Sequence, residues 1–162
     1  MTRPGRFLTF AALLLAFLNG TAMAENNNPL VEKQFVILRS TTDYKEARRT
    51  ALKASQLLGT ALDLRGLSED KRIGLTFDER ICVEEGGADY PCYVARGRYD
   101  DGDYVSIEYS SAFEGFAKGY YIVVSSSYTR GSMEISEALR KAKRYFKNAY
   151  SKTSNVYVGC IH

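Results

Sequence analysis

Short apolar runs and helix-like repeats alternate twice along the chain. In the first unit, residues 34–39 (QFVILR) form a continuous apolar run rich in branched side chains, as in a central strand. Asp43 and Glu46 have the spacing of a capping box, and small or apolar residues then recur at helical spacing: Ala47, Ala51, Ala54 and Leu58. Gly59 stands at a helix C-cap position. Residues 61–67 (ALDLRGL) alternate leucine with polar residues and predict a closing strand.

The same order of predicted strand, helix and closing strand recurs near the C-terminus. Residues 120–124 (YYIVV) predict a strand, and Ser132 is a plausible N-cap. One helix face is then predicted to consist of Ile135, Ala138, Leu139, Ala142, Phe146 and Ala149. The closing run, residues 155–161 (NVYVGCI), alternates like residues 62–67 of the first unit. The sequence therefore predicts two β-α-β units.

The region between the units has a different pattern. Residues 72–110 carry turn signals at Gly86-Gly87 and at Asp101-Gly102, and the alternation of Val105, Ile107 and Tyr109 predicts a strand with one buried face. We expect two inserted β-hairpins here. The predicted fold class is α+β, a ferredoxin-like layer of two β-α-β units with an antiparallel sheet. We expect one shared sheet, because half of such a chain would be short of core. Helices would cover one face, and the other would be covered by the hairpins, be polar or bind a ligand.

The N-terminal residues predict an export signal. Arg3 and Arg6 precede an apolar run at residues 7–18, and the small-x-small triplet Ala22-Met23-Ala24 suits a cleavage site. The run is shorter than the roughly 20 residues that span a bilayer, so we interpret residues 1–24 as a cleaved signal peptide rather than an anchor. Residues 25–33 would be a disordered segment and residues 34–162 a single α+β domain. The expected location is the periplasm, with no transmembrane segment after cleavage.

The charge balance gives little support for binding to nucleic acid. The chain has 22 Lys and Arg against 19 Asp and Glu, and without Arg3 and Arg6 the count is 20 against 19. A local excess lies on the predicted last helix, with Arg140, Lys141, Lys143, Arg144 and Lys147. This excess is either a solvated helix face or a basic surface for an acidic partner, such as peptidoglycan carboxylates, anionic lipid head groups or an acidic protein.

The three cysteines are typical of a structural disulfide rather than of a catalytic site. Cys82 and Cys92 flank a turn sequence, so in an oxidising compartment we expect them to form a disulfide. Cys160 would then be a buried thiol, and a bridge to Cys160 is the alternative.

Residues for enzyme chemistry are scarce. The one histidine, His162, is the last residue and a poor general base, and with Cys160 it supplies only two ligands of a metal site. The acidic run at residues 100–103 (DDGD) lacks the EF-hand spacing and suits a solvated turn. The carboxylates that glycoside hydrolysis would need cannot be placed from the sequence: Glu84, Glu85, Asp100, Asp101 and Glu108. We expect no enzymatic activity, no cofactor and no metal.

The order of strand, hydroxyl residues, alanine-rich helix and closing strand resembles the SPOR (sporulation-related repeat) domain. Residues 35–40 (FVILRS) and 120–127 (YYIVVSSS) would be the opening strands, and residues 62–67 and 155–161 the closing ones. The chain departs from that family in the long β region between its units. The resemblance implies an exported, ferredoxin-like domain that binds peptidoglycan glycan strands on the sheet face without helices, with a role in cell division or envelope upkeep.

Two functions of different classes remain open, and a structural protein of unknown partner is a third reading that composition does not separate from them. The first is a non-enzymatic envelope-binding domain, in which tyrosines stack on sugar rings and hydroxyl or basic groups assist. Its candidate residues are Tyr104, Tyr120, Ser125, Ser127 and Tyr128, together with Arg140, Lys143, Arg144 and Lys147. The alternative is a periplasmic inhibitor or immunity protein that blocks a lytic enzyme. It would present the acidic loop between Cys82 and Cys92, or residues 99–103, to a basic target. The expected partner is therefore a glycan strand or an envelope protein.

Overall fold

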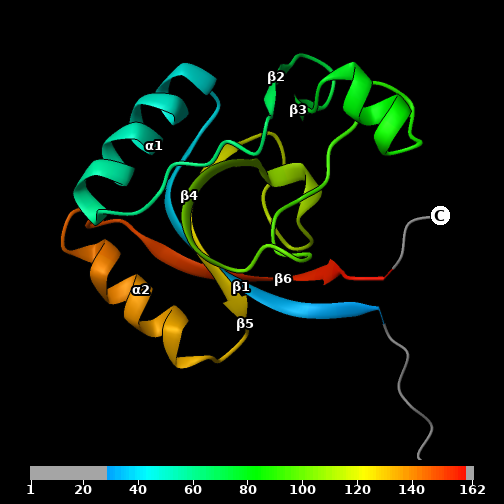
Figure 1. Cartoon of the computed structure of the whole chain (residues 1–162). Helices are drawn as coiled ribbons and strands as arrows, with labels where there is room; N and C mark the ends of the chain where they lie inside the picture. The colour runs from blue at the N-terminus through cyan, green and yellow to red at the C-terminus, as the bar shows by residue number, and fades with distance from the viewer. Residues whose placement is uncertain (1–28, 160–162) are drawn as a thin grey trace, which may run out of the picture.

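Mixed helices and strands make up residues 29–159, the part of the chain that the computed structural model describes (Figure 1). Their order is β1 (Leu30–Thr41), α1 (Tyr44–Leu58), β2 (Ser68–Asp70), β3 (Gly74–Thr76), β4 (Gly102–Tyr109), β5 (Tyr121–Thr129), α2 (Met133–Lys143) and β6 (Tyr150–Tyr157). A short π-helix (Ile81–Glu85) follows β3, and one 3-10 turn (Ser110–Ala112) follows β4. The predicted α+β class is confirmed.

The main sheet has four antiparallel strands in the order β4-β5-β1-β6. Strands from both predicted units lie in it, so the expectation of one shared sheet is confirmed. Both α-helices pack on the same face, where one apolar cluster joins them to the strands (Figure 1). The ferredoxin-like assignment of this layer stays a prediction.

Local signals place both helices. Asp43 caps α1 by accepting a hydrogen bond from the backbone N–H of Lys45, and Gly59 ends it at φ 59°, a left-handed conformation that suits glycine. Ser132 caps α2 by accepting from the N–H of Ile135. The predicted end of α2 was wrong, because the α-helix ends at Lys143 and a turn follows.

The two closing strands are unequal. In the first unit only Leu62 pairs, in one isolated parallel bridge to Val105. Arg65 and Gly66 then adopt positive φ angles of 58° and 67°, which turn the chain away from the sheet. The second unit closes with the eight-residue β6, which starts at Tyr150, five residues before the predicted start. The predicted repeat is therefore an unequal one.

The middle region holds one hairpin instead of two. Strands β2 and β3 form it, and the carboxylate of Asp70 accepts from two backbone N–H groups in its turn. Asp101-Gly102 is not a hairpin tip, since Gly102 begins β4 and β4 pairs with β5. Cys82 and Cys92 form the predicted disulfide, with their Cα atoms 5.7 Å apart.

The N-terminal boundary also needs correction. Residues 30–33, which we expected to be disordered, belong to β1 and pair with β6. The predicted signal peptide (1–24), Cys160 and His162 lie outside the described residues. Within residues 29–159, no helix combines the length and apolarity that a bilayer crossing requires.

The sheet has an apolar cluster on each face. On the helix face, Val36, Leu38 and Val123 pack against the alanines of α1. On the opposite face, which we call the loop face, the cluster consists of Phe35, Ile37, Phe113, Phe116, Ile122, Val124 and Val156. Phe113 and Phe116 come from residues 110–118, the capping loop, and the ring centroids of Phe113 and Phe35 are 5.0 Å apart. Loops therefore cover much of the face that the resemblance leaves open.

Candidate functional site

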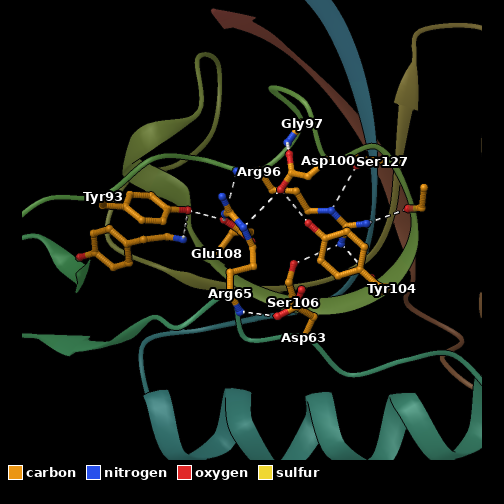
Figure 2. A network of polar contacts seen from close by, with 12 residues as sticks. Asp63, Arg65, Tyr93, Arg96, Gly97, Asp100, Tyr104, Ser106, Glu108 and Ser127 are labelled. Carbon is orange, nitrogen blue, oxygen red and sulfur yellow. Dashed lines mark hydrogen bonds and ion pairs between the residues drawn. The ribbon is translucent and has the colours of Figure 1, made fainter. Parts of the chain in front are cut away.

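A second segment, residues 93–101, crosses the loop face and holds a buried polar network there (Figure 2). Arg96 of this crossing segment is fully buried. Its guanidinium donates hydrogen bonds to the Ser127 hydroxyl (3.1 Å), the Ser106 hydroxyl (3.1 Å) and the carbonyl oxygens of Tyr104 (2.8 Å) and Gly102 (2.7 Å). It also lies 3.5 Å from the centroid of the Tyr104 ring. Arg96 thereby ties the segment to β4 and β5.

Glu108 is the second centre of the network. Its side chain is fully buried, and its Oε2 accepts from Arg65 Nη1 (2.8 Å), the Tyr93 hydroxyl (2.5 Å) and the backbone N–H of Arg96 (3.3 Å). Arg65 also lies 3.2 Å from Asp100, whose carboxylate accepts from Tyr104 and Gly97. Figure 2 shows Arg65 between the two carboxylates.

Burial and the neighbouring groups shift the pKa values of three residues in this network. Burial lowers the pKa of Arg96, and it raises the pKa of Tyr93, which the neighbouring Glu108 raises further. Burial alone would raise the pKa of Asp100, but the Tyr104 and Gly97 hydrogen bonds and the nearby arginines outweigh it, so the pKa is lower than usual. A carboxylate and two arginines held this way serve to fix the crossing segment, since Arg96 and Glu108 have no exposed surface for a substrate.

Several residues that we selected from the sequence belong to this interior. Ser127 is fully buried, Ser125 is nearly so, and the hydroxyl of Tyr104 donates to Asp100. Tyr128, by contrast, is partly buried on the helix face, where it lines a hollow beside α2. The prediction that Ser125 and Ser127 face a ligand needs correction, because both are buried and Ser127 accepts a hydrogen bond from Arg96 of the crossing segment.

Tyr120 is the predicted residue that lines a hollow on the loop face. The hollow has a volume of about 160 Å³ and is lined by Ser40, Ser110, Phe116, Ala117, Tyr120, Ile122, Tyr150 and Lys152. The exposed fractions of Tyr120 and Tyr150 are 39% and 40%. The Tyr150 and Ser40 hydroxyls are 3.1 Å apart, and the Lys152 ammonium lies 4.8 Å from the Phe116 ring centroid. We call this site the tyrosine hollow.

The predicted basic residues lie elsewhere. Arg140, Lys143, Arg144 and Lys147 are all exposed on or just after α2. Arg140 and Arg144 line a hollow of about 340 Å³ that also contains Glu134 and Glu137, so its charge is mixed. Lys147 lines a different groove, beside α1. The structure therefore brings Arg140 and Arg144 together with Tyr128, and it separates them from Lys147 and from the buried Ser127.

The disulfide fastens an acidic lobe, residues 77–92. Its exposed acids are Asp78, Glu79, Glu84, Glu85 and Asp89, and one of them, Glu85, pairs with Arg80. Val83 and Tyr90 are exposed beside them, by 52% and 42%. In Figure 1 this lobe lies at the opposite side of the molecule from α2.

No group of three or more histidine, cysteine, aspartate or glutamate side chains in residues 29–159 is arranged to hold a metal ion. Asp100 and Asp101, in the acidic run that could have suggested calcium, face protein groups instead. Asp100 accepts the hydrogen bonds described above, and Asp101 pairs with Lys33 of β1.

No pattern in the sequence marks Arg96, Arg65 and Tyr150 as residues of the network or of the hollow. Arg96 and Arg65 stand in glycine-containing polar stretches that look like exposed loops, and no periodic signal marks them as buried. Tyr150 was missed because the last helix was expected to run to Ala149. No protein-family model, curated protein or solved structure matches this chain.

Proposed function

We propose that this protein is an exported, non-enzymatic binding protein of the periplasm, which holds peptidoglycan glycan strands at the tyrosine hollow. The observation that carries the proposal is the pair of half-exposed rings, Tyr120 and Tyr150, beside an apolar floor with hydroxyl and ammonium groups at its edge. Sugar rings have apolar faces that pack on aromatic rings and hydroxyls that bond to polar groups, so the hollow offers both kinds of contact.

The size of the hollow supports a polymer rather than an enclosed small molecule. At about 160 Å³ it is smaller than the roughly 300–1,000 Å³ of typical small-molecule pockets. One sugar unit would sit in it while the strand continued across the surface. The buried position of Glu108 favours binding over hydrolysis, because a general acid must reach the glycosidic oxygen.

The test is co-sedimentation of residues 25–162 with purified sacculi. Tyr120→Ala should raise the dissociation constant by about threefold to tenfold, the value of one aromatic contact. The matched control is Tyr145→Ala, which removes another exposed tyrosine, 51% exposed, in the turn after α2. Absence of wild-type retention, or equal loss in both variants, would contradict the proposal.

The acidic lobe supports a second candidate, an inhibitor of a basic lytic enzyme. A disulfide-held loop costs little ordering entropy on docking, and its carboxylates complement a cationic cleft. The test is inhibition of a lysozyme-type enzyme by the wild type and by a Glu84→Gln/Asp89→Asn variant. This candidate requires inhibition by the wild type that the variant loses, whereas the glycan proposal predicts the same result for the wild type and the variant.

A further inference from the structure

A larger groove lies on the other side of Tyr150 from the tyrosine hollow. Its volume is about 500 Å³, and it runs between α1 and the turn that precedes β6. Leu38 and Phe146 supply apolar surface, and the polar groups include Lys53, Lys147 and Asn148. The groove is thus built from three segments that are far apart in the sequence.

The charge of this groove is positive. Glu46 is its one acid, and both of its oxygens are occupied: Oε1 accepts from Arg39 Nε (3.0 Å) and Nη2 (2.6 Å), and Oε2 accepts from the Thr41 hydroxyl (2.6 Å). The hydrogen bonds from Thr41 and Arg39 lower the pKa of Glu46, so it stays ionised and paired with Arg39. Within residues 29–159, Lys53 and Lys147 form no ion pair, and both are exposed.

The groove and the tyrosine hollow share a wall. Ser40 and Tyr150 line both of them, and their hydroxyls are 3.1 Å apart. A ligand that occupies both the groove and the hollow would therefore pass over Ser40 and Tyr150. A single polymer with a neutral ring and a nearby anionic branch fits this arrangement.

We propose that the groove binds carboxylates of the peptide stems that branch from a glycan strand, while a sugar of the strand packs in the tyrosine hollow. This inference rests on the proposed function and adds a subsite to it. Lys53 and Lys147 attract the carboxylate from α1 and from the turn before β6, and Asn148 supplies a side-chain amide as a hydrogen-bond donor. The protein would then distinguish peptide-bearing glycan from stripped glycan.

The experiment compares two ligands made from the same material: soluble glycan fragments that keep their peptide stems, and the same fragments after an amidase has removed them. Calorimetry should give a dissociation constant about threefold to tenfold lower for the peptide-bearing fragments, because exposed ion pairs contribute little each. The double variant Lys53→Gln/Lys147→Gln should lose this preference and keep wild-type affinity for stripped fragments. Higher salt should reduce the preference of the wild type.

The control is Lys45→Gln, which changes an exposed lysine of the same helix outside the groove and should keep the preference. Equal wild-type affinity for the two fragments would overturn the carboxylate subsite and leave the glycan site standing. If the double variant loses affinity equally for both fragments, the subsite is also overturned, because the lysines would then bind glycan whether or not it carries peptide stems. Binding of neither fragment to the wild type would overturn the proposed function itself.

Discussion

The helix face of the sheet is closed by small apolar side chains on two amphipathic helices, whereas the loop face is closed by two irregular segments that carry charge. Under α1 the contacts come from Ala47, Ala51 and Ala54, all buried. On the opposite face, the capping loop contributes phenylalanines and the crossing segment contributes Arg96.

The way each face of the sheet is covered determines where a ligand can bind. Helices cover their face evenly, since side chains recur every turn. The irregular segments cover the loop face unevenly. The tyrosine hollow stays open between the capping loop, the C-terminal end of β1 and the start of β6. The loop face therefore combines a rigid buried network with surface that stays accessible.

The largest effect should come from breaking the network. Arg65→Ala leaves the buried carboxylate of Glu108 without its ion-pair partner, which typically costs about 3–5 kcal/mol of unfolding free energy. Urea denaturation measures it, and Arg72→Ala, at an exposed arginine, should stay within about 0.5 kcal/mol. A loss below about 1 kcal/mol for Arg65→Ala would mean that the network does not hold the loop face.

The second-largest loss of stability should come from removing the disulfide. The Phe77 N–H and the Thr76 hydroxyl both donate to the carbonyl of Cys92, just before the crossing segment begins. Replacing both cysteines (Cys82→Ala/Cys92→Ala) removes a bridge with a sequence separation of 10, for which loop entropy gives about 2–3 kcal/mol. Unchanged stability relative to the oxidised wild type would contradict this expectation, and peptide mapping that joins Cys160 to either cysteine would overturn the pairing.

On the helix face the expected effects are smaller. Ala51 and Ala142 are each 1% exposed, so Ala51→Leu or Ala142→Leu forces extra volume between helix and sheet and should cost about 1–3 kcal/mol. Thermal unfolding measures it against Lys143→Ala, which lies on the exposed side of α2 and should change stability by less than about 0.5 kcal/mol. The reverse ranking would mean that the helices pack in another phase.

The smallest effect should be a change in pH dependence. Because the folded-state pKa of Asp100 lies below its usual value, its stabilising contribution is present above the unfolded pKa of about 3.9 and is lost as the pH falls through the folded pKa. Asp100→Asn should therefore be less stable than the wild type at neutral pH, and the gap should narrow below about pH 4. A gap that is constant with pH would show that the Asp100 charge does not matter.

The sequence predicts the helix face well because each of its signals is local. The caps Asp43, Gly59 and Ser132 and the buried alanines all follow from spacing along the chain. Turn residues likewise indicated the bridge between Cys82 and Cys92.

The loop face depends on contacts between distant segments, which local patterns do not contain. Ser106 and Glu108 alternate with apolar residues as on a solvated strand face, yet both are buried beneath the crossing segment. The same holds for the candidate site, where Tyr120 could be selected from the sequence but its partner Tyr150 could not. Tyr150 reaches the hollow because the chain turns after Lys143 and β6 begins early.

The central claim is that the loop face, at the tyrosine hollow, binds glycan. The most direct test is a chemical-shift map of the isotope-labelled protein titrated with soluble glycan oligomers. The account predicts dose-dependent shifts at Ser40, Tyr120, Tyr150 and Lys152, and unchanged signals at Tyr145 and at Tyr90 of the acidic lobe. Shifts confined to the lobe or to the outer side of α2, with the tyrosine hollow unchanged, would contradict it.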